Sequence, residues 1–245
     1  MKQTVLTVQT NEPIAKSVFK MTLTGDLSDV IRPGQFVNLK LDGFYLRRPI
    51  SVCDKVGDTL TLIYKTVGDG TRALARYEKG KEIDCVTGLG NGYDAALSGD
   101  APLLVGGGVG VPPLYWLART LIAEGKRVTV ILGFNTADEV FFENEFRALG
   151  ANVVVTTVDG SRGTKGFVTD ALAGLDYTYV YTCGPEPMLR ALYRATKADG
   201  QYSFERRMGC GFGACMGCTC KTITGHKRIC RAGPVLTRGE ILWED

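Results

Sequence analysis

Five of the eight cysteines in this chain fall between Cys210 and Cys230. Cys210, Cys215 and Cys218 follow the spacing C-x4-C-x2-C, and eleven further residues precede Cys230. A cluster of two irons needs four thiolates, and this is the plant-type spacing for a [2Fe–2S] centre. The pattern therefore predicts a loop that wraps three ligands around a cluster, with the fourth ligand on a separate strand.

Glycines surround these cysteines at Gly209, Gly211, Gly213 and Gly217. Glycine allows the backbone to turn sharply, which brings backbone N–H groups close to the sulfurs. Such donors stabilise the net negative charge of an iron–sulfur cluster. The glycines therefore support the interpretation of these cysteines as ligands of an iron–sulfur cluster.

Other interpretations of the cysteines stay open. A structural zinc site usually has two C-x2-C pairs, whereas this loop has one. Disulfides need an oxidising compartment, and residues 1–4 show no apolar signal segment. Free thiols without a role are a third alternative.

Cys220 is a fifth cysteine for four positions, so we interpret it as a neighbour of the cluster. His226 could replace Cys230 in a Rieske-like site, but that site uses two histidines and the chain has one.

The composition is that of an ordinary globular protein. A chain of 245 residues can hold two compact domains and a small appendage. The net charge of +3 is too weak to indicate a nucleic-acid partner, and no dense basic run is present. No apolar stretch reaches the ~18 residues that a membrane span requires. We expect a soluble cytoplasmic protein, in a compartment reducing enough for thiolates to bind iron.

The first hundred residues are expected to fold as strands. Segments 3–8, 18–23, 35–41 and 60–65 are rich in strand-forming residues, and several of them alternate apolar and polar positions. Glycine and proline turns separate them. Short strands with such turns predict a small antiparallel barrel over residues 1–100.

Two features of this barrel could bind an anion. Residues 47–52 read Arg-Arg-Pro-Ile-Ser-Val, and an arginine can pair with a diphosphate through two hydrogen bonds. Gly68-Asp69-Gly70-Thr71 precedes a short predicted helix over 71–76, and a glycine-led helix start offers free N–H groups. The alternative is that Arg47 and Arg48 are solvated charges on an edge strand.

The pattern changes at residue 101. A short apolar strand over 102–105 leads into Gly-Gly-Gly-Val-Gly at 106–110, and apolar residues at helical spacing follow over 114–121. Strand, glycine loop and helix form the architecture that binds dinucleotide phosphates. Prolines stand where the third Rossmann glycine would be, so the strict fingerprint fails, and a tight turn is the alternative.

Strands and helices then alternate, which predicts a parallel sheet over 101–200 with ligands at the carboxyl ends of its strands. The strands are expected over 127–132, 153–157 and 179–182, with helices around 142–146 and from 168–172. No acidic residue directly follows the second strand to bind a ribose hydroxyl, and Arg162 could favour a 2′-phosphate.

Several of these residues resemble the ferredoxin–NADP reductase superfamily. The resemblance implies FAD in the barrel, with Ser51 near the flavin ring and, less directly, Tyr64 by the ribityl or adenosine part. It implies that Cys183-Gly184-Pro185 lies where a nicotinamide approaches the flavin, and it favours NADH. The FAD residues implied are Arg48, Pro49, Ile50, Ser51, Ile63, Tyr64, Lys65, Gly70 and Thr71. The NAD residues implied are Gly106, Gly107, Gly108, Gly110, Cys183, Gly184 and Pro185.

The compact C-terminal segment, with Glu-Arg-Arg-Met-Gly-Cys-Gly at 205–211, resembles that of the electron-transfer subunits of the NAD-dependent dihydroorotate dehydrogenase B family. The resemblance implies electron transfer between NAD(H) and an FMN-containing catalytic subunit, through FAD and a [2Fe–2S] cluster, in pyrimidine (UMP) biosynthesis. It implies a cytoplasmic heterotetramer with two copies of each subunit. The chain shows no general base for dihydroorotate, so substrate oxidation is expected on the partner.

The expected order is a FAD-binding barrel at 1–100, an NAD-binding α/β domain at 101–200 and a [2Fe–2S] domain at 201–245. Two other functions remain open. One is a reductase for another acceptor, such as a sulfur reductase or hydrogenase partner. The other is a redox sensor that performs no catalysis.

Overall fold

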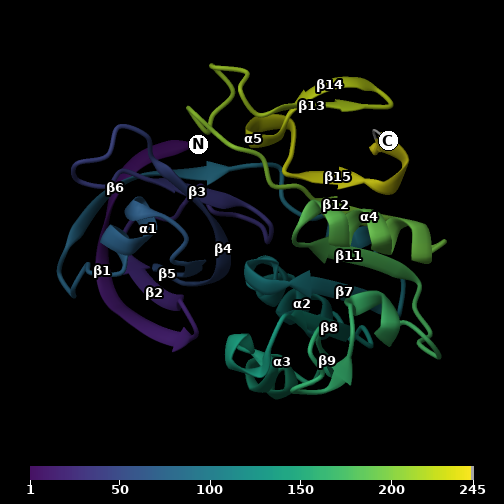
Figure 1. Ribbon diagram of the computed structural model, residues 1–245. Helices are drawn as coiled ribbons and strands as arrows, with labels where there is room; N and C mark the ends of the chain where they lie inside the picture. The colour runs from purple at the N-terminus through teal and green to yellow at the C-terminus, as the bar shows by residue number, and fades with distance from the viewer. Residues whose placement is uncertain (244–245) are drawn as a thin grey trace.

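The computed structural model describes residues 1–243. Figure 1 shows a barrel built from the N-terminal part of the chain, beside a sheet built from its middle part. The C-terminal segment lies at the top of the same view, above both. The order of the three parts follows the order expected from the sequence.

Six antiparallel strands close the barrel in the order β1-β2-β5-β4-β3-β6. Buried and less buried positions alternate along β6, and Ile83 and Cys85 are among the buried side chains of the barrel core. A helix of six residues, α1, follows β5. The bounds are β1 (Lys2–Ala15), β2 (Val18–Thr24), β3 (Phe36–Leu39), β4 (Arg48–Val56), β5 (Thr59–Lys65), α1 (Asp69–Leu74) and β6 (Glu82–Leu89).

A seven-stranded sheet follows in the order β10-β9-β8-β7-β11-β12-β15. Its strands are parallel except for β15, which pairs antiparallel with β12 at the edge. The strands are β7 (Pro102–Gly107), β8 (Thr129–Phe134), β9 (Asn152–Thr157), β10 (Thr164–Lys165), β11 (Tyr179–Cys183), β12 (Gly200–Ser203) and β15 (Val235–Thr237). The helices are α2 (Pro113–Ala123), α3 (Glu143–Ala148) and α4 (Glu186–Ala195).

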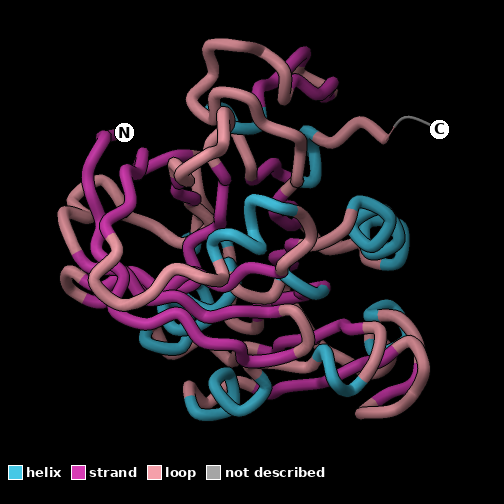
Figure 2. The backbone as a smooth tube through the Cα atoms, turned by 60° about the vertical axis from the view of Figure 1, so that its left-hand side comes forward, coloured by secondary structure: helices cyan, strands magenta, loops and turns pink. Residues whose placement is uncertain are grey.

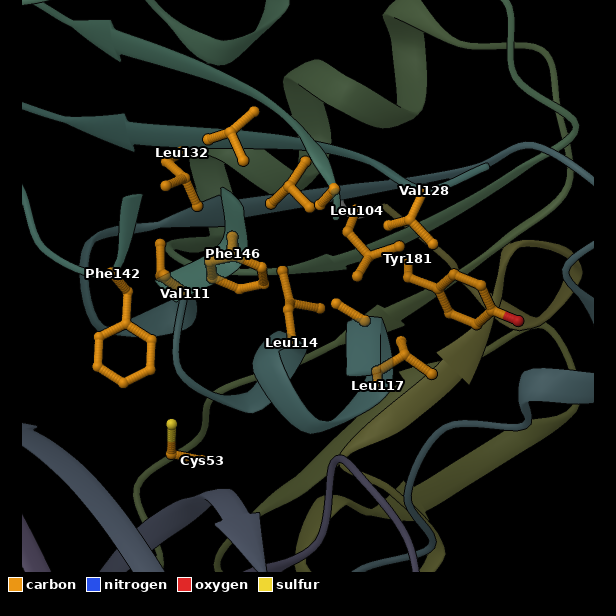
Figure 3. Close-up of a cluster of buried hydrophobic side chains, with 14 of the residues drawn as sticks. Cys53, Leu104, Val111, Leu114, Leu117, Val128, Leu132, Phe142, Phe146 and Tyr181 are labelled. Carbon is orange, nitrogen blue, oxygen red and sulfur yellow. The ribbon is translucent and has the colours of Figure 1, made fainter. Parts of the chain in front are cut away.

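The barrel and the sheet share one apolar core. Helix α2 inserts Leu114 and Leu117 between them, and Cys53 of β4 belongs to the same buried cluster. Figure 3 shows Cys53 on the barrel side of α2, opposite the side chains that cover the sheet. Burial of this apolar surface fixes the barrel against the sheet.

The predicted cysteine loop lies between β12 and β15. A hairpin of β13 (Thr219–Thr222) and β14 (Gly225–Arg228) follows the loop, and α5 (Ile229–Ala232) leads into β15. Figures 1 and 2 both place this hairpin at the end of the molecule away from α3. Since β12 and β15 belong to the sheet, both ends of the cysteine segment are held by the sheet edge.

Short 3-10 turns occupy several connections. The helix expected from 168–172 is such a turn, Val168–Ala171, because Gly166 and Gly174 with left-handed backbone close it at both sides. The other turns are Ala95–Leu97, Gly108–Gly110, Ala137–Glu139 and Arg238–Glu240. Among the described residues, no helix is long and apolar enough to cross a membrane.

Candidate functional site

Backbone N–H groups of the cysteine segment donate hydrogen bonds to its sulfurs. The Cys210 Sγ accepts from the backbone N–H groups of Ala214 at 3.3 Å and Cys215 at 3.4 Å. The Cys215 Sγ accepts from the N–H of Cys210 at 3.5 Å, and the Cys218 Sγ accepts from that of Cys230 at 3.4 Å. Hydrogen bonds to cysteine sulfur are the contacts that stabilise and tune an iron–sulfur cluster.

Left-handed backbone makes this arrangement possible. Gly211 has φ +78° and Gly213 has φ +96°, a region that side chains with a Cβ rarely adopt. A Cβ on Gly211 would meet the Asn38 side chain at 2.4 Å, and one on Gly213 would meet Arg231 at 2.9 Å. The two glycines therefore serve both the bend of the loop and its close packing.

The four thiols lie within electrostatic reach of one another. Burial raises the pKa of the Cys230 thiol, and the charges of Cys218, Cys210 and Cys215 raise that pKa further. Burial also raises the pKa of Cys210, but the N–H groups that face its sulfur outweigh burial and lower the pKa overall. The loop therefore favours the thiolate form of Cys210.

These residues fit a [2Fe–2S] cluster by the chemistry of their donors: four thiols, three of which have backbone N–H groups directed at their sulfurs. Within residues 1–243, no three His, Cys, Asp or Glu side chains are gathered to hold a metal ion. A [2Fe–2S] cluster spreads its four thiolates over two irons. Its ligands therefore need not gather around one point, as the ligands of a single metal ion do.

The two remaining candidates of this segment take other places. Cys220 on β13 is half-buried in the apolar cluster that contains Phe204 and Ile229, and burial raises its pKa. His226 on β14 is exposed and pairs in register with Lys221. Neither residue donates to or accepts from the sulfurs of the loop in the hydrogen bonds among residues 1–243.

On the barrel, Arg48 and the start of α1 come together. A Cβ on Gly70 would lie 2.2 Å from Arg48 Nε, so only glycine admits the guanidinium at this distance. Thr71 Oγ1 accepts from the N–H groups of Val67 and Gly68, which orders the turn before the helix. Arg47 is engaged elsewhere, because its guanidinium forms an ion pair of 2.8 Å with Asp84.

The other barrel candidates lie on β4 and β5. Pro49, Ile50 and Ser51 are half-buried on β4. Tyr64 points into the barrel core, where its hydroxyl donates to Asn11 Oδ1 at 2.8 Å and burial raises its pKa. Ile63 belongs to the core shared with the sheet.

A cavity of about 540 Å³ opens at the carboxyl ends of the parallel strands. The predicted residues Gly107, Gly108, Gly110, Gly184 and Pro185 line it. This is the place where an α/β sheet of this kind binds a dinucleotide. Lys65 of the barrel also lines the cavity, so the cavity reaches from the sheet to the barrel.

The two predicted NAD loops touch each other. A Cβ on Gly110 would lie 2.2 Å from the carbonyl oxygen of Cys183, and one on Gly107 would lie 2.5 Å from Met188 Sδ. Gly106 packs on Val111, where a Cβ would meet its Cα at 2.8 Å. Gly106 and Cys183 thus contribute close packing behind the cavity wall.

Two residues of the site were not predicted from the sequence. Glu139 lines the cavity, and its carboxylate forms an ion pair of 2.7 Å with Lys65, which joins the sheet domain to the barrel. Asn38 Nδ2 donates to the backbone carbonyl of Cys210 at 3.1 Å. Both contacts are long-range, so no local pattern could have indicated them.

Comparison with known families matches two segments of the chain. Residues 205–242 match the iron-sulfur cluster binding domain of dihydroorotate dehydrogenase B. Residues 104–194 match the oxidoreductase NAD-binding domain. The first match contains all four loop cysteines, and the second contains the glycine loop of the cavity.

Two curated relatives are similar over nearly their whole length, and both are described as the electron transfer subunit of dihydroorotate dehydrogenase B (NAD(+)). The protein from Geobacillus sp. (strain WCH70) is 45% identical over 256 residues, covering 99% of each chain. The protein from Bacillus mycoides (strain KBAB4) is 46% identical over 257 residues, covering 98% of each.

Solved structures show the same architecture. An NADH-dependent reduced ferredoxin-NADP oxidoreductase studied for flavin-based electron bifurcation aligns with a TM-score of 0.88 at 30% identity, covering 97% of this chain and 90% of that one. The ferredoxin reductase of carbazole 1,9a-dioxygenase aligns with a TM-score of 0.67 at 20% identity, covering 79% and 64%, and shares the fold.

Proposed function

The chain belongs to the family of electron transfer subunits of dihydroorotate dehydrogenase B (NAD(+)), and we propose how its residues perform that role. It is an oxidoreductase subunit that uses NAD(H), FAD and a [2Fe–2S] cluster, and it works with a catalytic partner subunit. We assign the partner as an FMN-containing dihydroorotate dehydrogenase in an assembly of two copies of each subunit.

The four loop cysteines are proposed to hold the cluster. Cys210, Cys215, Cys218 and Cys230 supply the thiolates, and the N–H groups directed at the sulfurs of the first three stabilise the negative charge. This donor pattern is the observation that carries the assignment. Cys220 stands outside the set.

The FAD site is proposed on the barrel. The guanidinium of Arg48 packed on Gly70 supplies a bidentate cation for the diphosphate, and Thr71 orders the turn beside it. Pro49, Ile50 and Ser51 extend along the same strand from Arg48, and Ile63, Tyr64 and Lys65 follow on β5. Of these last three, Tyr64 supports the barrel wall from inside.

The NAD site is proposed in the cavity of about 540 Å³. Gly107, Gly108 and Gly110 allow a pyrophosphate to approach the backbone, and Gly184 and Pro185 line the cavity next to them. Gly106 and Cys183 support these two loops from behind. Lys65 of the barrel also lines the cavity, which supports binding of the dinucleotide next to the strands proposed for FAD. FAD held by the barrel residues would supply the conversion between the two-electron hydride of NADH and the single electrons that a [2Fe–2S] cluster takes.

The catalytic partner is proposed to dock on the exposed side of the cluster loop. Cys215 is exposed there, with Phe212 at 45% and Met216 at 61% exposure beside it. Exposed apolar side chains of this kind are typical of interaction surfaces. We propose a cytoplasmic location, because the thiolates of an iron–sulfur cluster need a reducing compartment.

The test is anaerobic purification followed by assays of FAD and iron and a visible spectrum. We expect roughly one FAD and two irons per chain. NADH should bleach the flavin, and the isolated chain should not oxidise dihydroorotate. Zinc without iron, or turnover of dihydroorotate by this chain alone, would overturn the proposal.

A second candidate function is a reductase for another electron acceptor. The likeness to the NADH-dependent reduced ferredoxin-NADP oxidoreductase covers 97% of this chain and favours it. Reduction of a copurified FMN subunit by dihydroorotate, with electrons appearing on NAD⁺ through this chain, would exclude that candidate.

A further inference from the structure

Strand β3 presents two different faces. Val37 and Leu39 point into the barrel core, and alternation places Phe36 and Asn38 on the outer face. That outer face is nevertheless covered, since Phe36 is 3% exposed and Asn38 is 1% exposed. Phe36 packs in the apolar cluster that contains Cys218. The cysteine segment therefore covers the outer face of β3.

The neighbouring strand β4 carries proposed FAD residues on this same face. In the β3–β4 register Asn38 lies opposite Pro49, and Phe36 lies opposite Ser51. Residues directly opposite each other in an antiparallel pair point to the same side of the sheet. Asn38 thus shares its face with Pro49 and Ser51 and at the same time touches the cluster loop.

The Asn38 amide is fixed at one end and open at the other. Its Nδ2 donates to the carbonyl of Cys210 at 3.1 Å, and a carbonyl can only accept, so the nitrogen must face the loop. The absent Cβ of Gly211 makes room for this nitrogen. At the other end, Oδ1 is buried and has no hydrogen-bond partner among residues 1–243. A buried acceptor without a partner is rare and costly in folded proteins.

We propose that Asn38 is a positioning residue that holds the cluster loop against the face of β3 and β4 that carries the proposed FAD residues Pro49 and Ser51. Nδ2 fixes the loop at Cys210, and Oδ1 remains as an acceptor for a donor brought by the bound cofactor. The proposal rests on the FAD and cluster assignments made above. The amide takes no part in the redox step, but it fixes the separation across which single electrons pass.

The test uses two variants of Asn38 with a matched control. Asn38→Ala removes the amide, and Asn38→Asp keeps its shape but replaces the donor with an acceptor that repels the Cys210 carbonyl. The control is Asn91→Ala, because Asn91 also binds the C-terminal segment, donating to Val235 O at 2.8 Å, but at β15. Each loaded protein is mixed anaerobically with NADH, and flavin bleaching and cluster bleaching are followed separately.

We expect flavin and cluster bleaching at the wild-type rates in Asn91→Ala. In the two Asn38 variants cluster bleaching is measured relative to flavin bleaching, because loss of the proposed contact between Oδ1 and FAD alters the flavin step as well. Cluster bleaching should slow by about tenfold or more in both Asn38 variants, since small displacements of reacting groups cost that much. The electron paramagnetic resonance spectrum of the dithionite-reduced cluster should also change in these two variants and not in Asn91→Ala. Loss of the cluster from both Asn38 variants, with FAD retained, would equally show that the loop depends on this amide.

Wild-type rates of cluster bleaching and an unchanged spectrum in Asn38→Ala and Asn38→Asp would overturn the inference. An equal defect in Asn91→Ala would overturn it too, because any loosening of the C-terminal segment would then suffice. Failure of the proposed function looks different: the wild-type protein itself would lack iron, or its flavin would not respond to NADH.

Discussion

The guanidinium of Arg162 lies 2.7 Å from the carboxylate of Glu143 at the start of α3. Arg162 follows β9 in a loop that begins at the cavity, where Val158 is a lining residue. From the sequence, Arg162 was a candidate for binding a 2′-phosphate. The ion pair engages its charge within the protein instead, which agrees with the use of NADH rather than NADPH.

Glu143→Gln should therefore raise the affinity for NADP⁺ by releasing Arg162. We expect an increase of about fivefold, because an exposed ion pair contributes about 1 kcal/mol. The affinity for NAD⁺ should stay the same. Titration calorimetry with both nucleotides measures the two constants. Arg147→Ala is the control, since it removes the other partner of Glu143 and leaves Arg162 paired. Equal changes for both nucleotides would contradict the prediction.

Two adjacent arginines on the barrel should behave differently. Arg48→Met should weaken FAD binding by about tenfold to a hundredfold, as loss of a charged hydrogen-bond donor costs about 1.5–3 kcal/mol. Arg47→Met should retain FAD, because Arg47 is committed to Asp84. FAD retained after gel filtration gives the comparison. Greater FAD loss from Arg47→Met than from Arg48→Met would refute the assignment.

Local sequence patterns predicted the parts of this fold that are themselves local. The alternation in 18–23 predicted β2, the strand-forming residues of 60–65 predicted β5, and the glycine run after residue 105 predicted the cavity loop. The return of the chain as β15 was not predicted, because three residues, Val235–Thr237, carry too little periodicity. Its pairing with β12 depends on a partner more than thirty residues away.

The functional site shows the same difference between local features, which the sequence predicts, and long-range contacts, which it does not. The cysteine spacing indicates four candidate ligands, and backbone N–H groups within the same segment point at three of their sulfurs. Lys65 was selected as an FAD residue, yet its ion pair with Glu139 depends on how the barrel packs against the sheet. Asn38 carries no signal in the sequence, because its partner Cys210 lies 172 residues away.

The cysteines of the C-terminal segment can be separated by substitution. Cys218→Ser should lose the cluster and abolish electron transfer to the partner, whereas NADH should still bleach the flavin. Cys220→Ser should keep its iron, because Cys220 packs with apolar side chains instead of the loop donors. Iron content and single-turnover bleaching provide the readouts. If Cys218→Ser also lost its response to NADH, the order of the carriers would be different.

The ion pair between Lys65 and Glu139 should make the stability of the protein depend on pH. The Lys65 ammonium lowers the pKa of Glu139 below its usual 4.5, as a favourable partner of the charged form must. The unfolded state then binds a proton more readily than the folded state does. The contribution is therefore complete above about pH 4.5 and is lost as pH falls through the folded pKa. Glu139→Gln lacks this contribution at every pH.

At neutral pH we expect Glu139→Gln to lower the free energy of unfolding by about 1 kcal/mol. The difference from wild type should shrink as pH falls below about 4.5, because the wild-type carboxylate becomes protonated. Urea unfolding from neutral pH down to about pH 3 measures both effects.

Lys65→Met should remove the same pH dependence, and the double variant should cost less stability than the sum of the two single variants. Glu145→Gln, on the exposed side of α3, should change stability by less than about 0.5 kcal/mol. A constant difference across this range would show that Glu139 acts through packing and not through its charge.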